Sequence, residues 1–268
     1  MIKILLINLS QSCDRLQAQL KQFKKLNLEF ERLEAVSVQQ ISEKFYQKSL
    51  KTSQRLMKQT ELACLLSHKK AWQYVFDHKT PCVILEDDAV IAGDFKLLLS
   101  ELENIHFNKI DLINLEVHGR KKIVSKQKNM DLLEKKYQLY ELFLDKSGAA
   151  GYVLYPSGAK KLLEQLSKQI WLADAIIHNC PNMHCYQIEP AVVIQSDRCS
   201  WYDIPFSDYA FHSMIGNIKN TQNIKLSISQ KINLKKNRVL AQILLAFRTI
   251  YANYLGEKRY ISVNKTDF

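Results

Sequence analysis

The sequence predicts an α/β protein whose mixed, mostly parallel sheet is flanked by helices. Two observations lead to this fold class: short apolar runs alternate with amphipathic stretches along the chain, and the first of them form a strand-helix-strand unit. The 268 residues include 47% hydrophobic residues but only seven glycines and five prolines, and no tandem repeat is visible. This composition is typical of a globular protein with one large domain, with or without an appendage.

The strand-helix-strand unit comes first in the chain. The apolar run at 2–9 (IKILLINL) predicts a buried strand, and the run at 30–36 (FERLEAV) predicts a second one. A helix between them is predicted by apolar residues at helical spacing, namely Leu16, Leu20 and Phe23. Because a crossover helix joins parallel strands, the unit indicates a parallel pair.

The middle of the chain continues the alternation after a polar, basic segment at 40–59, which predicts a loop or a short irregular helix. A broad apolar face predicts a helix over 60–78, with His68 near its middle. The remaining elements expected in this part are a strand at 81–85, a helix at 95–105 and a strand at 109–117.

The later part of the chain is expected to have shorter elements. The lysine-rich stretch at 118–129 predicts a loop. The elements expected after it are a strand at 137–144, a strand at 151–155, a helix that begins at Pro156, a short segment at 171–178 and a late strand at 185–195. Short connections between the late strands favour a mixed sheet.

The character of the chain changes after Ser213, so we expect a main domain at 1–213 and a basic extension at 214–268. Residues 219–268 hold ten basic and two acidic residues, which is eight of the eleven net positive charges. An amphipathic helix is predicted by a stripe formed by Leu240, Ile243, Leu244, Phe247, Ile250, Tyr251, Tyr254 and Leu255. Such a helix either packs on the core or binds an anionic membrane surface.

Cysteine usage and the start of the chain bear on the compartment. Six cysteines without paired spacing are typical of reduced thiols in a cytoplasmic protein. The segment HNCPNMHC (178–185) offers His178, Cys180, His184 and Cys185, but its spacing matches no standard zinc module, and structural roles are favoured. The start, MIKILLINLS, has neither the length nor the cleavage site of a signal peptide or span, so a cytoplasmic protein is expected.

Three adjacent carboxylates, Glu86, Asp87 and Asp88, follow the strand predicted at 81–85. Their mutual repulsion is costly unless water, a cation or a positive partner offsets it, so they form either a solvated turn or a site. Ligands of parallel α/β sheets collect beyond the carboxyl ends of strands, which favours a site. If strand geometry continues, Glu86 and Asp88 point to one side and Asp87 to the other.

Carboxylate oxygens suit Mg²⁺ or Mn²⁺, which bridge protein to substrate phosphates. A cation here can neutralise charge on a departing diphosphate, and direct displacement at a sugar carbon then needs a base for the acceptor hydroxyl. The candidates for this base are Asp174, Glu116 and His118, at expected strand or turn ends.

Six blocks, in this order and spacing, resemble glycosyltransferase family 25 from about Ile4 to Ser200: INLSQSCDR, ELACLLSHKKAW, VILEDDA, DLINLE, GAAGYVLYPSGAKKLL and ADAII. The resemblance implies a GT-A-like, Rossmann-type fold, a UDP-sugar donor, a divalent metal (Mn²⁺ or Mg²⁺) and inversion at the anomeric carbon. The family's usual glycine after Glu61 is replaced by Leu62, which puts the local helix start in doubt.

Residue by residue, the resemblance implies Asp174 as the catalytic base or an acceptor contact and Asp88 with Asp87 as metal and diphosphate ligands, while Glu116 is a second catalytic candidate from its place in the chain. The positions implied for the nucleotide sugar are Asn8, Leu9, Arg15, Ser67, His68, Glu86 and Asp87. Structural alternatives remain for several positions: an ion pair for Arg15, a satisfied histidine for His68, a core place for Trp72, a helix cap for Asp174, and backbone geometry for Gly148 and Gly151.

These observations predict a cytoplasmic, peripheral-membrane enzyme that moves a hexose, galactose rather than another sugar, from a UDP-sugar to a lipooligosaccharide acceptor. The basic tail is expected to bind the anionic inner membrane. The same chemistry with UDP-glucose is one alternative, and a non-catalytic module that binds anionic membrane surfaces is another. A nucleic-acid partner is not expected, because the basic residues lack interleaved stacking aromatics.

Overall fold

The structure is a computed structural model that describes residues 1–268 apart from 106–108, 147 and 205–227. Its strands are β1 (Lys3–Asn8), β2 (Glu31–Glu34), β3 (Cys82–Glu86), β4 (Ala89–Ile91), β5 (Leu112–Asn114), β6 (Glu116–Val117), β7 (Lys122–Ser125), β8 (Met130–Leu132), β9 (Tyr137–Leu144), β10 (Gly151–Leu154), β11 (Cys185–Glu189), β12 (Val193–Gln195) and β13 (Gly256–Arg259). Its helices are α1 (Cys13–Lys25), α2 (Glu43–Ser49), α3 (Gln59–His78), α4 (Phe95–Glu103), α5 (Pro156–Lys168), α6 (Ala173–Asn179) and α8 (Ile228–Leu255). Short 3₁₀ turns are η1 (Val38–Gln40), η2 (Ser196–Tyr202) and η3 (Lys265–Asp267).

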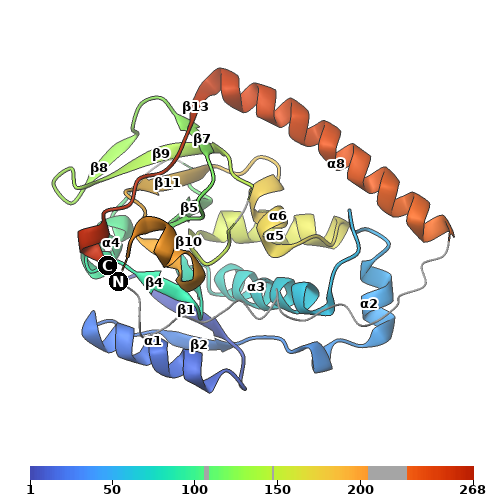
Figure 1. The fold of residues 1–268 in the computed structure, drawn as a ribbon, viewed down its shortest axis with the longest axis horizontal. Helices are drawn as coiled ribbons and strands as arrows, with labels where there is room; N and C mark the ends of the chain where they lie inside the picture. The colour runs from blue at the N-terminus through green and yellow to red at the C-terminus, as the bar shows by residue number, and fades with distance from the viewer. Residues whose placement is uncertain (106–108, 147, 205–227) are drawn as a thin grey trace.

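A large sheet with helices on both faces runs through the molecule (Figure 1). In the described residues it has ten strands in the order β13-β7-β9-β11-β5-β10-β3-β1-β2, with β8 paired to β9. Strands β2, β1, β3, β5 and β11 run in one direction, and β10 lies reversed between β3 and β5. The predicted fold class is therefore confirmed: a mixed sheet, mostly parallel in its central part, flanked by helices.

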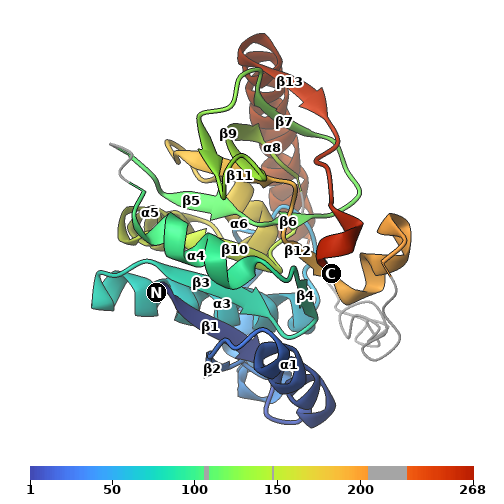
Figure 2. The ribbon, with the colours of Figure 1, turned by 90° about the vertical axis from the view of Figure 1, so that its left-hand side faces the viewer.

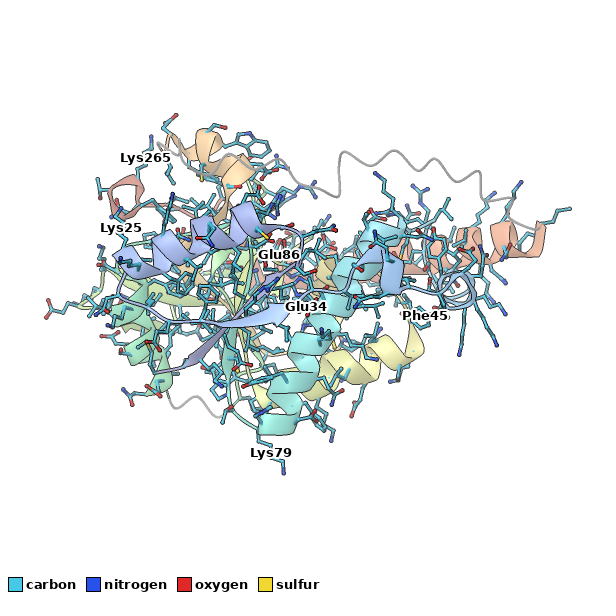
Figure 3. The ribbon with its side chains drawn as sticks, turned by 90° about the horizontal axis from the view of Figure 1, so that it is seen from below. Lys25, Glu34, Phe45, Lys79, Glu86 and Lys265 are labelled. Atoms are coloured by element: carbon cyan, nitrogen blue, oxygen red, sulfur yellow. The ribbon has the colours of Figure 1, made fainter. Side chains whose placement is uncertain are left out.

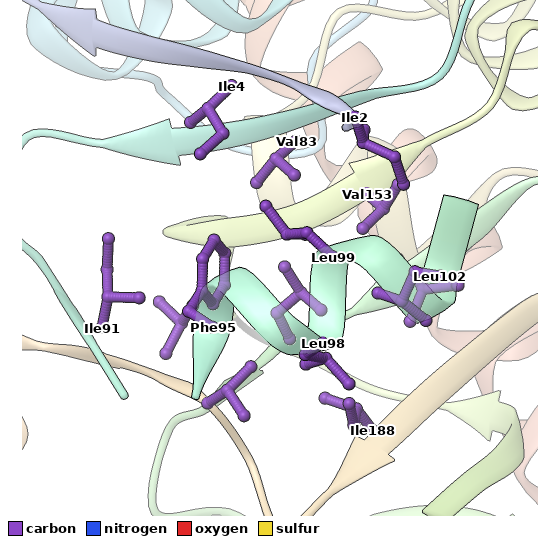
Figure 4. Close-up of a cluster of buried hydrophobic side chains, with 14 of the residues drawn as sticks. Ile2, Ile4, Val83, Ile91, Phe95, Leu98, Leu99, Leu102, Val153 and Ile188 are labelled. Atoms are coloured by element: carbon purple, nitrogen blue, oxygen red, sulfur yellow. The ribbon is translucent and has the colours of Figure 1, made fainter. Parts of the chain in front are cut away.

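Alternate residues of the central strands enter two separate cores. In β1, Ile4 and Leu6 face the core under α1 and α4, which Figure 4 shows, while Leu5 and Ile7 face the core under α2, α3, α5 and α6. A slip of the strand pairing by one residue would move each of these side chains to the opposite face of the sheet. Burial of each apolar side chain contributes about 1.5–3 kcal/mol, so such a slip is costly. The alternation therefore fixes the register, in which Ile7 of β1 lies beside Glu86 of β3.

A small sheet of three strands, β4-β12-β6, lies next to the carboxyl ends of the central strands (Figure 2). Strand β12 lies in its middle, antiparallel to β4 and parallel to β6. Asp88 immediately precedes β4, and Glu116 is the first residue of β6. This small sheet thus brings together two chain segments that carry predicted site residues.

Several elements differ from the sequence prediction. The stretch at 118–129, predicted as a loop, contains β7, which pairs with β9 and β13. The late strand expected at 185–195 is two strands in different sheets, β11 and β12. The polar segment at 40–59, by contrast, contains the short helix α2, which is one of the two alternatives predicted for it and buries Tyr46 and Ser49. These segments carry weak local periodicity, so their partners in the fold determine their structure.

The C-terminal residues 256–268 belong to the main sheet rather than to a separate element. Strand β13 pairs antiparallel with β7, and Asp267 accepts hydrogen bonds from Lys136 and from the hydroxyl of Tyr137, both at 2.9 Å. The backbone N–H of Ala191 donates to Ser262. The predicted boundary between 213 and 214 lies outside the described residues and stays a prediction.

Helix α8 lies along one side of the molecule (Figure 1) and touches it through a narrow face. Ala252 is buried against Ile123 and Leu144, and the side-chain amide of Asn237 donates to Ser53 O at 3.1 Å. Of the apolar stripe predicted from the sequence, all but Leu255 are exposed. None of the described helices combines the length and the hydropathy needed to cross a membrane.

Candidate active site

Asp87 joins three elements at the carboxyl edge of the sheet. Its Oδ1 accepts from Arg15 Nη1 at 2.7 Å, and its Oδ2 accepts from Asn8 Nδ2 at 2.8 Å. Gln19, also on α1, donates to Asp87 O at 3.1 Å. Burial raises the pKa of Asp87, and the guanidinium of Arg15 opposes that rise. The predicted residues Asn8, Arg15 and Asp87 therefore meet, with both carboxylate oxygens of Asp87 engaged.

Glu86 points to the other side of the chain, toward α3. Its Oε1 lies 2.9 Å from Nε2 of His68, whose Nδ1 lies 2.9 Å from the hydroxyl of Tyr152. Trp72 donates to the same hydroxyl at 2.8 Å and lies fully buried, which confirms its place in the core. Glu86 lies toward the middle of the molecule in Figure 3 and keeps partial solvent exposure. His68 is thus a buried orienting group behind an accessible carboxylate.

Asp88 is buried and incompletely bonded. Its backbone oxygen accepts from Ser196 N at 2.9 Å, but its Oδ1 has no hydrogen-bond partner. Burial first, and then the charges of Glu86 and Asp87, raise the pKa of Asp88 to about 8. A buried carboxylate oxygen without a partner is costly unless a ligand supplies one.

Glu116 is the second buried carboxylate with a free oxygen. Its Oε2 accepts from Ala150 N at 2.7 Å, whereas its Oε1 has no hydrogen-bond partner. Gly148, at φ +97°, packs so closely on Glu116 that an added Cβ would lie 1.4 Å from Oε1. Burial raises the pKa of Glu116 well above its ordinary value, against the opposing charge of Lys122.

Lys122 and its hydrogen-bond partners hold the backbone of Glu116 in place. The ammonium of this buried lysine donates to Glu116 O at 2.9 Å and to Gln187 Oε1 at 2.7 Å, and it pairs with Asp145 Oδ2 at 2.8 Å. Asn114 accepts from Glu116 N at 2.9 Å. Because the lysine's charge is balanced by Asp145, Glu116 keeps its raised pKa.

Asp174 lies in the first turn of α6 and is partly exposed. Its Oδ1 accepts from the N–H of the next residue, Ala175, at 2.7 Å. The N-cap of α6 is Leu172, so Asp174 does not have the helix-capping role that the sequence left open. Burial raises the pKa of Asp174, with His178 opposing and Glu86 adding to the rise. The charge of Glu86 also raises the pKa of Asp88 and of Glu116, so Glu86 interacts electrostatically with each of the other three carboxylates.

A divalent cation fits the free oxygen of Asp88, because hard cations prefer carboxylate oxygens and take the rest of their ligands from water and phosphates. The group of three ligand-type side chains found among the described residues is a different one, Cys64, His68 and Glu86, whose ligand atoms lie within 4.8 Å of one another. Both ring nitrogens of His68 are already hydrogen-bonded, so that group is internally satisfied.

Other predicted positions have contacts within the fold. Leu9 packs on the core under α3, and Ser67 Oγ accepts from Val36 N at 2.8 Å. Glu61 accepts from Lys58 N at 2.8 Å and caps the start of α3 despite the leucine that follows it. In HNCPNMHC, His178 Nε2 lies 2.9 Å from Gly148 O, and all six cysteines of the chain are free thiols, as expected.

Sequence reasoning missed the segment η2, which follows β12 and lies beside Asp88. Arg198, on this turn, has a buried Nε without a hydrogen-bond partner, and Nδ1 of His118, a candidate base predicted from the sequence, is likewise buried without one. Trp201, on the same turn, is 58% exposed. In the sequence, the one visible sign of this region is that Arg198 lies three residues before Trp201, and no recognisable motif surrounds them.

We expect Glu116→Gln to stabilise the protein at neutral to alkaline pH. The folded-state pKa of Glu116 lies above its unfolded value of about 4.3, so its stabilising contribution is complete below that value and is lost as pH rises through the folded pKa. Thermal unfolding of the metal-free variant at pH 8 should show a gain on the order of 1–3 kcal/mol that vanishes near pH 4. The exposed Glu164→Gln is the control, and a less stable variant at pH 8 would contradict the expectation.

The comparisons with known proteins agree with the predicted resemblance. The model of "Glycosyltransferase family 25 (LPS biosynthesis protein)" matches residues 1–177. The "Lacto-N-neotetraose biosynthesis glycosyltransferase LgtE" of Neisseria meningitidis serogroup B is 26% identical over 155 residues, which cover 53% of this chain and 55% of LgtE. A "Putative glycosyltransferase" of Haemophilus influenzae is 28% identical over 148 residues, which cover 54% of this chain and 50% of that protein.

The chain therefore spans about half the length of the curated relatives it matches. Among solved structures, the glycosyltransferase GlyE of Streptococcus pneumoniae aligns with a TM-score of 0.40 and 10% identity, over 98% of this chain and 66% of GlyE. The family match covers well over half of the sequence and confirms the resemblance carried by its six blocks. The chain thus belongs to glycosyltransferase family 25 (LPS biosynthesis protein).

Proposed function

We propose that the chain is a metal-dependent, inverting hexosyltransferase that moves galactose from a UDP-sugar to a lipooligosaccharide acceptor. The observation that carries this proposal is the pair of buried, unpartnered carboxylate oxygens, Asp88 Oδ1 and Glu116 Oε1, at one edge of the sheet. Burying a polar group without a hydrogen-bond partner costs free energy of folding. A bound cation and substrate hydroxyls would supply the missing partners and offset that cost.

On the donor side, Asp88 would hold the divalent cation, Mn²⁺ or Mg²⁺, which supplies positive charge next to the donor's diphosphate. Both carboxylate oxygens of Asp87 are engaged, one by the ion pair with Arg15 and one by the hydrogen bond from Asn8, an arrangement that we call the clasp. Asp87 would therefore serve the site through this clasp and not as a metal ligand. That clasp fixes the turn after β3 and so orients Asp88. Glu86, oriented by His68, would accept a hydroxyl of the donor sugar.

On the acceptor side, Asp174 would be the base. It is partly exposed, has a raised pKa and lies at the start of a helix beside Glu86. Inversion in one displacement requires that this base take the proton of the attacking hydroxyl on the face opposite the departing diphosphate. Glu116 is more deeply buried and would accept a hydrogen bond from the reacting sugar through Oε1.

Galactose is proposed over glucose because the name of LgtE connects that relative with lacto-N-neotetraose biosynthesis. UDP-glucose remains the alternative donor. A non-catalytic module that only binds anionic membranes is less well supported, because a solvated turn has no need for two buried carboxylates with raised pKa values.

We also propose that α8 holds the enzyme at the inner face of the cytoplasmic membrane. Residues Leu240, Ile243, Leu244, Phe247, Ile250, Tyr251 and Tyr254 share a surface that faces away from the body of the protein. Lys231, Lys235, Lys236 and Arg238 precede it on the same helix. Apolar side chains beside basic ones are typical of helices that lie in an anionic lipid interface.

Asp88→Asn should abolish the metal-dependent part of UDP binding. We expect at least a tenfold loss of affinity for UDP with Mn²⁺, no further loss on adding chelator, and a roughly 10²-fold slower release of UDP from UDP-galactose with deacylated lipooligosaccharide. Isothermal titration and a UDP-release assay over UDP-galactose, UDP-glucose and UDP-N-acetylglucosamine measure this. The exposed Asp77→Asn is the matched control, and chelator-insensitive transfer by the wild type would sink the metal proposal.

Asp174→Asn should lower kcat by about 10²–10⁴-fold while leaving UDP affinity unchanged, because only proton removal in the transition state is lost. Steady-state kinetics of Asp174→Asn and Glu116→Gln, measured side by side, test the assignment of the base. A larger loss of kcat in Glu116→Gln than in Asp174→Asn would transfer the role of base to Glu116.

Binding to anionic vesicles should depend on the exposed face of α8. We expect the triple change Leu244→Ser, Phe247→Ser and Tyr251→Ser to weaken binding to phosphatidylglycerol vesicles by tenfold or more. Transfer to a deacylated acceptor should stay unchanged. Leu97→Ser and Phe76→Ser, at exposed apolar positions on other helices, are the controls. Equal vesicle binding by the triple variant and the wild type would refute the role of this face.

A further inference from the structure

The turn η2 begins between the two unpartnered carboxylates. Strand β12 pairs with β6 so that Val193 lies beside Glu116, and with β4 so that Gln195 lies beside Ala89. The next residue, Ser196, donates its N–H to Asp88 O at 2.9 Å. The orange turn next to β4 and β12 in Figure 2 is this segment. The turn η2 therefore begins beside the segment that carries Asp88.

Trp201 is an anchored and partly exposed aromatic side chain on this turn. It is 58% exposed, yet it packs directly on Gly119, where an added Cβ would lie 2.4 Å from the indole carbon Cε3. Gly119 has φ +62° and donates its N–H to the hydroxyl of Tyr202 at 2.7 Å, which fixes the contact from the other side. A large indole that is anchored but left exposed is the kind of surface on which a sugar ring stacks.

Two cationic or polar nitrogens face the same place. The guanidinium of Arg198 lies 4.3 Å from the centre of the Trp201 ring, and its Nε is buried without a hydrogen bond. Arg198 Nε forms an ion pair with Asp197 Oδ1 at 3.4 Å, without the geometry of a hydrogen bond. His118, at the end of β6, has a buried Nδ1 that also lacks a partner.

The free groups at the site thus divide by charge. Among the described residues, the unpartnered buried atoms next to the β4-β12-β6 sheet are two carboxylate oxygens, on Asp88 and Glu116, and two nitrogens, on His118 and Arg198. The carboxylates accept from hydroxyls or bind a cation, whereas the guanidinium offers donors to an anion. Arg15 lies on α1 beside Asp87, so the two arginines approach the carboxylates from different elements.

We propose that Trp201, Arg198 and His118 form the acceptor subsite, and that the acceptor is a saccharide with an anionic substituent, a phosphate or a carboxylate, close to the sugar that receives the hexose. The sugar ring stacks on Trp201 while its anionic group binds Arg198 and His118. This proposal rests on the proposed function, because it assigns the second substrate of the same site.

Binding of four probes tests the proposal without requiring turnover: glucose 6-phosphate, glucose, inorganic phosphate and UDP. Isothermal titration calorimetry with and without UDP and Mg²⁺ measures each of them. We expect glucose 6-phosphate to bind about tenfold more tightly than glucose or phosphate. Arg198→Gln should remove that advantage, and Trp201→Ala should weaken both sugars about tenfold while Trp201→Phe retains them.

UDP affinity should stay unchanged in all three variants, and Arg55→Gln, at an exposed arginine, should match the wild type in every measurement. Loss of UDP affinity in Arg198→Gln with unchanged binding of glucose 6-phosphate would assign the cluster to the donor instead. Equal binding of glucose and glucose 6-phosphate, or no binding of either sugar by the wild type, would also overturn the proposal. Failure of the proposed function itself has a separate signature, which is a wild-type protein that does not bind UDP.

Discussion

The ion pair between Arg15 and Asp87 fastens α1 to the end of β3 at the place where the carboxylates gather. Both side chains are almost fully buried, and Asn8 completes the bonding of Asp87 from the end of β1. Breaking one partner of a buried pair leaves an uncompensated charge and costs about 3–5 kcal/mol. The pair therefore holds the turn after β3 in one conformation, and the positions of Glu86 and Asp88 follow from it.

This clasp explains how three adjacent carboxylates coexist. Each of them faces a different environment: Glu86 meets His68, Asp87 meets Arg15, and Asp88 meets the small sheet. The side chains of Glu86 and Asp87 have partners within the protein, so of the three only Asp88 has a buried oxygen without a hydrogen-bond partner, and its pKa is raised to about 8. The three carboxylates can lie side by side because His68 and Arg15 bind Glu86 and Asp87. The remaining repulsion falls on Asp88, whose charge a cation can neutralise.

The sequence predicted those parts of the fold that have a local cause. The apolar run of β1 and the helical spacing of apolar residues in α1 and α3 identify these elements, Pro156 marked the start of α5, and an acid run after an apolar run located the end of β3. The pairing of β13 with β7, and the place of β12 between β4 and β6, depend on contacts between distant segments that leave no local pattern. For the same reason the clasp role of Asp87 and the nearness of Arg198 to the site were not predictable.

A series of contacts connects the C-terminal helix to the buried carboxylate. Arg248 on α8 donates to the backbone oxygen of His178, whose Nε2 lies 2.9 Å from Gly148 O, and Gly148 packs against Glu116. Strand β13 (Gly256–Arg259) then returns to the sheet and pairs with β7, whose first residue, Lys122, donates to Glu116 O. The helix therefore contacts the supports of the site from two directions, through α6 and through β7. A surface held on α8 would thus have a fixed orientation relative to the carboxylates, which is what transfer to an acceptor anchored in that surface requires.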